Sequence, residues 1–319
     1  MKTWIYSLLT ILLLQHATIL SAQQTKTFKV IPLGVLGGID ESNLSAYMLA
    51  PAGFSDYVCL DAGTLHYGIK KAIENNALNG DVDEVLKKSI KGYLISHPHL
   101  DHVAGLIINS PDDVNKNIYG LPSCLDVLRD NYFTWKSWAN FGSEGDKPIL
   151  NKYHYTPLTP GAETPIASTT MSVQAFVLSH GNPYQSTAFL VKSGDSYLLY
   201  LGDTGADQIE KSNKLQILWQ EVAPLVKSKK LKAIMIEVSY PDEQPEKQLF
   251  GHLTPKLLMH EMDVLGKLSG IQAMKGLPVV ITHIKPSGHH EAQIKQELGN
   301  ANSLQLKLII PEQGKLLEF

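Results

Sequence analysis

The sequence is poor in cysteine, in clustered positive charge and in long apolar runs. It has 319 residues but only two cysteines and no Cys-x-x-Cys pair, which excludes a disulfide-dense scaffold and a thiolate metal site. Lys and Arg total 28 against 31 Asp and Glu, so the net charge is −3, and no basic run favours long nucleic acid. The 44% hydrophobic and 18% charged residues are typical of a globular protein, in which 12 histidines are unusual.

The one long apolar run is at the N-terminus. Lys2 precedes an apolar stretch over 4–14, and small residues follow near 21–23. Residues 1–22 are therefore predicted to be a secretory signal peptide. An uncleaved membrane anchor is the alternative, but Gln15 and His16 leave the run too short to span a bilayer. We expect a mature chain over 23–319, periplasmic or secreted, without a membrane anchor.

The two cysteines leave their own pairing open. Export would permit a disulfide between Cys59 and Cys124. Cys59, however, lies in an apolar strand pattern, which favours a small buried hydrophobic residue. Any metal site must therefore be built from His and carboxylate side chains.

Short strand and helix patterns alternate along the mature chain. The strands are expected at 28–35, 46–50, 57–60, 92–95, 172–178, 187–191, 197–201, 233–238, 278–282 and 304–309. The helices are expected at 65–76, 82–89, 102–109, 121–131, 213–228, 255–268 and 289–298. Both halves mix the two types, which favours a single α+β domain of two sheets packed face to face with helices outside. Residues 111–165, where aromatic residues cluster, are expected to form an inserted cap.

The strongest local signal is a run of metal-binding residue types directly after the apolar strand at 92–95. It reads His97-Pro98-His99-Leu100-Asp101-His102, with four potential ligands within six positions. A tight turn there can direct His97 and His99 to one metal ion, and Asp101 and His102 to another. Imidazole and carboxylate suit zinc and similar divalent ions, so the run predicts a two-metal site.

The spacing His-x-His-x-Asp-His resembles the metallo-β-lactamase superfamily. The longer run from His97 to Pro111, HPHLDHVAGLIINSP, closely resembles the signature of the class II cyclic-nucleotide phosphodiesterases. The resemblance extends through Gly37–Ser45 and Asp61–Gly63 to the end of the chain. It implies an αββα four-layer sandwich with a dinuclear metal site between the sheets at their loop edge. It also implies hydrolysis of 3',5'-cyclic nucleotides, cAMP and cGMP, to nucleoside 5'-monophosphates.

Three residues at predicted strand ends match the family pattern for the remaining metal ligands. They are His180, Asp203 and His283, although isolated residues of these types are otherwise structural or exposed. The implied ligands of the first metal are His97, His99 and His180. Those of the second metal are Asp101, His102 and His283, and Asp203 bridges the two. Zinc is the expected ion, with iron or manganese as alternatives.

The resemblance also implies roles for residues next to the ligands. Asp61 matches a strand-end Asp that orients the His-rich turn, and a plain turn or helix cap is the alternative. His252, at a predicted helix start, matches a His that protonates the leaving group, with Glu237 placed to orient it. Loop chemistry alone is the alternative for His252. Asp101 would orient or deprotonate a water that becomes a hydroxide bridging the metals.

Candidates for substrate contacts lie in the expected cap. Trp135, Trp138 and Phe141 could stack on a base, although they could equally form a small core beneath a long loop. His154 is a further candidate in the same segment. The alternatives to a cyclic-nucleotide phosphodiesterase are another hydrolase of this fold, acting on a different phosphodiester, a lactone or a β-lactam, and a ligand-binding protein that keeps an inactive site. The sequence leaves a homodimer open.

Overall fold

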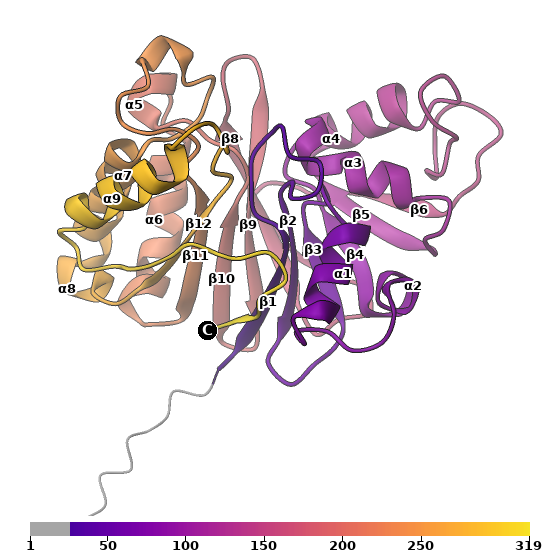
Figure 1. The fold of residues 1–319 in the computed structure, drawn as a ribbon, viewed down its shortest axis with the longest axis horizontal. Helices are drawn as coiled ribbons and strands as arrows, with labels where there is room; N and C mark the ends of the chain where they lie inside the picture. Colours follow the sequence, from indigo (N-terminus) through magenta and orange to yellow (C-terminus); the bar gives the residue numbers. More distant parts are fainter. Residues whose placement is uncertain (1–25) are drawn as a thin grey trace, which may run out of the picture.

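A computed structural model describes residues 26–319, and the predicted signal peptide lies outside them. Figure 1 shows two β-sheets packed face to face, with helices on both outer sides. The first sheet has the order β14-β1-β2-β3-β4-β5-β6, and the second has the order β13-β12-β11-β10-β9-β8-β7. This αββα arrangement confirms the predicted α+β four-layer sandwich.

The first half of the chain supplies most of the first sheet and the helices that cover it. Its strands are β1 (Phe28–Gly34), β2 (Ala46–Pro51), β3 (Tyr57–Leu60), β4 (Ile90–Leu94), β5 (Lys116–Gly120) and β6 (Tyr153–Pro157). Its helices are α1 (His66–Glu74), α2 (Val82–Glu84), η1 (Val85–Ser89), α3 (Leu100–Asn109), α4 (Pro122–Val127) and η2 (Leu128–Tyr132). The helices predicted at 82–89 and 121–131 each end in a π-helical stretch, η1 and η2.

The second half supplies the second sheet and its helices. Its strands are β7 (Glu163–Pro165), β8 (Ser172–Ser179), β9 (Gln185–Ser193), β10 (Ser196–Leu201), β11 (Leu231–Glu237), β12 (Pro278–Thr282) and β13 (Lys307–Ile309), and β14 (Leu317–Glu318) returns to β1. Its helices are α5 (Asp207–Glu210), α6 (Lys214–Lys227), η3 (Glu246–Gln248), α7 (Pro255–Ser269), α8 (Ile271–Met274) and α9 (His290–Ala301). No helix within 26–319 is long and apolar enough to cross a membrane.

Alternate residues of the central strands enter different apolar layers. In β2, Tyr47 lies in the layer between the sheets, whereas Met48 lies in the layer beneath α1 and α3. In β10, Leu198 lies between the sheets and Leu199 lies beneath α6 and α7. Side chains alternate across a strand, so strands that are apolar on both faces can hold four layers together.

Parallel strands at the centre of both sheets bring their carboxyl ends to one edge of the sandwich. β3, β4 and β5 are parallel neighbours in the first sheet, and β10, β11 and β12 are parallel neighbours in the second. The loops after the carboxyl ends of such strands are the usual place for a ligand site. The His97–His102 turn follows β4, Asp203 follows β10 and His283 follows β12.

The segment 111–165 is not one inserted cap. It contains β5 and β6, which extend the first sheet in parallel, and β7, which pairs with β8 at the edge of the second. The longest stretch of this segment outside strands and helices is 133–152. The predicted cap is too wide because Tyr153 and Tyr155 are the alternating buried residues of edge strand β6, rather than part of an aromatic lid.

Cys59 and Cys124 are free, buried thiols. Both lie in the apolar layer beneath the helices of the first sheet, and burial raises the pKa of the Cys59 thiol to about 12. The prediction that Cys59 is a small buried hydrophobic residue is confirmed, and Cys124 is likewise buried and unpaired.

Candidate active site

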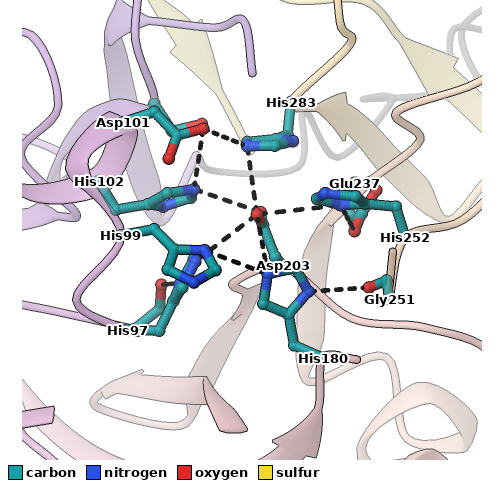
Figure 2. Close-up of polar contacts among 12 residues, drawn as sticks. His97, His99, Asp101, His102, His180, Asp203, Glu237, Gly251, His252 and His283 are labelled. Atoms are coloured by element: carbon teal, nitrogen blue, oxygen red, sulfur yellow. Dashed lines mark hydrogen bonds and ion pairs between the residues drawn. The ribbon is translucent and has the colours of Figure 1, made fainter. Parts of the chain in front are cut away.

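The His-rich run forms a turn between β4 and α3. His99 has extended backbone angles at the N-terminal end of α3, and Asp101 and His102 lie in the first helical turn. The change from extended to helical backbone directs His97 and His99 to one side and Asp101 and His102 to the other (Figure 2). The structure thus brings these four side chains to one point at the sheet edge.

Three residues from the second sheet meet this turn. His180 follows β8, Asp203 follows β10 and His283 follows β12, and all three are buried. Their side chains complete two groups in which the donor atoms lie within 4.8 Å of one another. The first group is His97, His99, His180 and Asp203. The second group is Asp101, His102 and His283.

Asp203 occupies the centre of the cluster (Figure 2). Its Oδ2 lies 3.6 Å from His97 Nε2 and 3.7 Å from His180 Nε2. The same carboxylate lies 3.3 Å from His102 Nε2, through Oδ1, and 3.2 Å from His283 Nε2. One carboxylate therefore faces imidazoles of both groups, which is the arrangement that a bridging ligand requires.

The donor set fits metal ions. The Nε2 atoms of His97 and His102 are buried and have no hydrogen-bond partner within the described residues. Buried polar atoms nearly always have a partner, and a divalent cation between these nitrogens would supply it. Five imidazoles and two carboxylates, without thiolate, suit zinc, iron or manganese.

The protonation of the cluster also suits a cation. Burial and the neighbouring His102 hold the pKa of His97 well below its ordinary value, and burial with His180 lowers that of His99 to about 4. Burial raises the pKa of the Asp203 carboxyl, but His283 and His102 outweigh it and keep the net pKa well below its ordinary value. Neutral imidazoles and an ionised carboxylate are the forms that bind metals.

The pKa of His102 is shifted in the opposite direction. Its burial lowers its pKa, but the carboxylates of Asp203 and Asp61 outweigh burial and raise it. These two carboxylates place excess negative charge around one imidazole. A divalent ion bound there would balance that charge.

Asp61 fixes two imidazoles of the first sheet. It is fully buried after β3 and accepts hydrogen bonds from His102 Nδ1 at 2.8 Å and from the Ser96 hydroxyl at 2.7 Å. Ser96 Oγ in turn lies 3.0 Å from His97 Nδ1. When His102 Nδ1 donates to this carboxylate and His97 Nδ1 donates to the serine oxygen, the neutral form of each ring has Nε2 as its acceptor, facing the cluster.

Glu237, at the end of β11, orients two imidazoles of the second sheet in the same way. It accepts a hydrogen bond from His252 Nδ1 at 2.7 Å and one from the Ser239 hydroxyl at 2.7 Å. Ser239 Oγ lies 3.0 Å from His283 Nδ1. Glu237 therefore orients His252 directly and His283 through a serine, and Nε2 of His283 faces Asp101 Oδ2 at 3.1 Å.

His252 lies beside the cluster rather than apart from it. Its ring stacks on that of His283, with centroids 5.2 Å apart, and its Nδ1 lies 3.9 Å from Asp203 Oδ2. It thus forms a third group of potential ligands with Asp203 and His283. Burial lowers the pKa of His252, but the Glu237 carboxylate outweighs burial and raises it. That contact favours the protonated imidazole.

The four substrate candidates of the predicted cap do not join the cluster. Trp138 Nε1 donates to Ser110 Oγ just after α3, at the opposite end of this ten-residue helix from the ligands, about 15 Å along its axis. Phe141 packs on the core beside Phe133, and Trp135 donates to the Pro148 carbonyl. His154 is an exposed residue of edge strand β6. Of the two interpretations of Phe141, the structure supports a small core beneath a long loop rather than a platform for stacking on a base.

Several site residues were not predicted from the sequence. Ser96 and Ser239 each link a buried carboxylate, Asp61 or Glu237, to an imidazole through hydrogen bonds. Tyr200 donates a hydrogen bond to Asp61 at 2.6 Å. Their only sequence signal is proximity, since Ser96 precedes His97 and Ser239 follows Glu237 by two positions. The Gly38 amide donates to Asp101 Oδ2 at 2.9 Å, and a Cβ on Gly37 would overlap the His283 ring.

Several known proteins are similar to this chain in sequence. The 3',5'-cyclic-nucleotide phosphodiesterase of Aliivibrio fischeri is 44% identical over 311 residues, which cover 93% of this chain and 94% of that protein. A probable 3',5'-cyclic-nucleotide phosphodiesterase of Yersinia pestis is 37% identical over 317 residues, covering 95% and 92%. Residues 25–314 match the sequence profile described as cAMP phosphodiesterases class-II.

Solved structures share the fold. Unliganded yeast PDE1 aligns with a TM-score of 0.81 at 24% identity, covering 92% of this chain and 100% of that one. The metallo-β-lactamase fold protein YhfI from Bacillus subtilis aligns with a TM-score of 0.61 at 16% identity, over 92% and 100%. The fold is therefore that of the metallo-β-lactamases. The profile match and the two relatives show more than the fold: this chain belongs to the class II cAMP phosphodiesterase family.

Proposed function

We propose that this protein is an exported, metal-dependent phosphodiesterase that hydrolyses 3',5'-cyclic nucleotides, cAMP and cGMP, to nucleoside 5'-monophosphates. The observation that carries the proposal is the complete donor set gathered around Asp203, in a chain of this family. The Aliivibrio fischeri relative, named as a 3',5'-cyclic-nucleotide phosphodiesterase, and the Yersinia pestis relative, named as a probable one, support the substrate class. A binding protein with an inactive site is a weaker alternative, because it would need no complete ligand set.

Two divalent ions, zinc in the first instance, would be held by the two groups. The first ion would have His97, His99 and His180 as ligands, the second would have Asp101, His102 and His283, and Asp203 would bridge. Bound there, the ions would supply positive charge that neutralises the phosphate and lowers the pKa of the attacking water. An acidic protein can bind an anionic substrate at such a site.

Asp101 would handle the proton of the attacking water. Its carboxylate is held by the Gly38 amide and faces His283, so its position relative to the cluster is fixed. The water oxygen forms a bond to phosphorus, and its proton passes to the carboxylate. In line with the attack, the bond between phosphorus and the ribose 3'-oxygen breaks.

His252 would protonate the departing 3'-oxygen. An alkoxide is a poor leaving group, so a positioned acid contributes substantially to breaking this bond. Glu237 stabilises the protonated form of His252 and fixes the ring through Nδ1, which directs Nε2 away from Glu237. The proton taken up from water by Asp101 and the one given by His252 balance, and the product is the 5'-monophosphate.

Phosphate release coupled to a 5'-nucleotidase tests the substrate class. The metal-loaded protein should release phosphate from cAMP and cGMP, and should cleave bis-(p-nitrophenyl) phosphate without opening a β-lactam. Elemental analysis should find close to two transition-metal ions per chain, removable by a chelator with loss of activity. Turnover of the β-lactam alone would replace the proposal with another hydrolase of this fold, and full activity with one ion would refute the two-metal scheme.

The proposal includes export. Residues 1–22 have the composition of a signal peptide. N-terminal sequencing of the protein recovered from the periplasm or medium should therefore begin near residue 23. A cytoplasmic protein that still begins at Met1 would refute export and leave the catalytic proposal untouched.

A further inference from the structure

The most exposed large apolar side chains gather around the metal-binding cluster. Within residues 26–319 they are Ile39, Phe250, Ile108, Leu100 and Tyr184, with exposed fractions of 81, 67, 65, 62 and 62%. Single exposed apolar residues need no explanation, but a concentration of them beside polar groups marks a ligand site. Ile39, Tyr184 and Phe250 belong to loops at the cluster, and Leu100 begins α3 between two residues of the cluster. Ile108 lies in the last turn of α3, away from it.

Each of the four lies next to a residue of the site. Leu100 stands between His99 and Asp101, and Ile39 follows Gly38, whose amide holds Asp101. The ring of Tyr184 meets that of His99 edge to face, with centroids 5.4 Å apart. Phe250 precedes Gly251, whose carbonyl accepts from His180 Nδ1 at 2.9 Å. These four exposed side chains therefore lie on the segments that carry the site, and we call them its rim.

Two of the four are aromatic and come from loops in direct contact. The Tyr184 amide donates to the Gly181 carbonyl at 3.0 Å, and a Cβ on Gly181 would lie 3.4 Å from the Phe250 carbonyl oxygen. Phe250 itself has a left-handed backbone, with φ of 52°. That conformation is unfavourable for a bulky residue, and such strain is found chiefly where function requires it. Here the strained residue carries an exposed phenyl ring and directly precedes Gly251, whose carbonyl contacts His180.

We propose that Tyr184 and Phe250 form a nucleobase subsite, on which the base of the substrate stacks while its phosphate lies at the cluster. The inference rests on the proposed function, because it assigns the part of the substrate that the metals do not bind. Bases stack on aromatic rings through their flat faces, which adenine and guanine share. The subsite is therefore expected to accept cAMP and cGMP alike, and it replaces Trp135, Trp138 and Phe141 in that role.

The test compares a substrate with a base and one without. Tyr184→Ala and Phe250→Ala are assayed on cAMP and on base-free ribose 3',5'-cyclic phosphate, with Ile108→Ala as the control for an exposed apolar residue outside the rim. Each rim variant should lose about 5- to 150-fold in its preference for cAMP over the base-free ring, mainly through KM. Ile108→Ala should keep the wild-type preference, and so should Tyr184→Phe and Phe250→Tyr, which retain a flat ring.

Two outcomes overturn the subsite. An equal loss on both substrates would mean that the rings support His99 or His180, and an unchanged preference would mean that no base contacts them. Metal content and thermal midpoint are measured for every variant. Tyr184→Leu and Phe250→Leu keep apolar bulk without a flat ring, so they repeat the test where an alanine variant does not fold.

A binding measurement separates this inference from the proposed function. Calorimetric titration of the metal-loaded protein with AMP and with ribose 5-phosphate needs no turnover. The wild type should bind AMP more tightly, and the alanine variants should lose that difference. If the wild type hydrolyses no cyclic nucleotide, the proposed function fails, and the titration still decides whether the rings hold a base.

Discussion

The two halves of the sandwich contribute to the site in different ways. The first half supplies His97, His99, Asp101 and His102 from one turn of six residues. The second half supplies three residues that lie alone at strand ends, separated by 23 and 80 positions along the chain. A local motif can be identified without the fold, whereas isolated ligands become a site only when parallel strands bring their ends together.

The halves resemble each other in how they hold the imidazoles. In each half, one buried carboxylate at a strand end accepts a hydrogen bond from a serine hydroxyl that also contacts an imidazole. The pairs are Asp61 with Ser96 and Glu237 with Ser239. They differ in what is held, because Asp61 orients two proposed ligands whereas Glu237 orients His283 and the proposed acid His252. Under the proposed function, the carboxylate of the first half would support metal binding alone, and that of the second half would support both metal binding and proton transfer.

Loss of Asp203 should have the largest effect, because this residue faces both groups. Asp203→Ala should abolish binding of at least one metal ion. It should lower kcat/KM on cAMP by more than the about 10²–10⁴-fold ascribed to a positioned acid. Metal analysis and the coupled phosphate assay measure both effects. Asp195→Ala, at a highly exposed carboxylate, is the control. Two bound ions and near-normal turnover in the variant would show that Asp203 is not the bridge.

His252→Ala should show whether His252 acts as a proton donor or as a metal ligand. Both metal ions should remain, and kcat on cAMP should fall by about 10²–10⁴-fold. The loss should be much smaller on bis-(p-nitrophenyl) phosphate, because p-nitrophenolate leaves without a proton. The same defect on both substrates would leave His252 as a positioning residue. Loss of metal would make it a ligand, as its grouping with Asp203 and His283 permits.

Asp61→Ala and Glu237→Ala test the division of labour between the two carboxylates. Asp61→Ala should weaken metal affinity by about 10–100-fold, because the orientation of His97 and His102 depends on it. Glu237→Ala should weaken it less and lower kcat more, with the greater loss on cAMP than on the p-nitrophenyl ester. Competition with a metal-binding dye gives the affinities. If the two variants lose metal equally, the comparison between the halves fails.

Trp138→Ala should have the smallest effect on activity. Its indole is hydrogen-bonded to Ser110, beyond the far end of α3, so kcat/KM on cAMP should stay within about twofold of the wild type. The lost hydrogen bond should lower the free energy of unfolding by about 0.5–1.5 kcal/mol, measurable by urea denaturation. A large rise in KM would restore the loop at 133–152 as a substrate platform.

The sequence predicted the parts of this molecule that have local signals. The strand, turn and helix around His97 were correctly anticipated, as was the helix start at Pro255, where Thr254 caps the Leu257 amide. The sandwich fold followed from the resemblance carried by the run from His97 to Pro111. In each of these cases the signal lies within a few neighbouring residues.

Other features depend on contacts between distant segments and were missed. β5 and β6 are separated in sequence by α4, η2 and the irregular stretch at 133–152, so no local signal marks Tyr153 and Tyr155 as a strand that pairs with β5. Ser96, Ser239 and Tyr200 carry hydroxyl groups whose partners are defined only by packing. The apolar rim of Tyr184 and Phe250 is likewise invisible without exposed fractions, because apolar residues in loops are common.

Tyr200 has a consequence for the order in which the enzyme matures. It belongs to β10 in the second sheet, yet its hydroxyl donates to Asp61 Oδ2 after β3 in the first, the same oxygen that accepts from His102. Ser96 of the first half already holds this carboxylate, but its full set of hydrogen bonds forms only when the two sheets have docked. A chain with only the first half folded therefore holds Asp61, and with it His102, less firmly. Metal binding is therefore expected to be the last step of folding. Chains with only one folded half are expected to bind metal ions weakly.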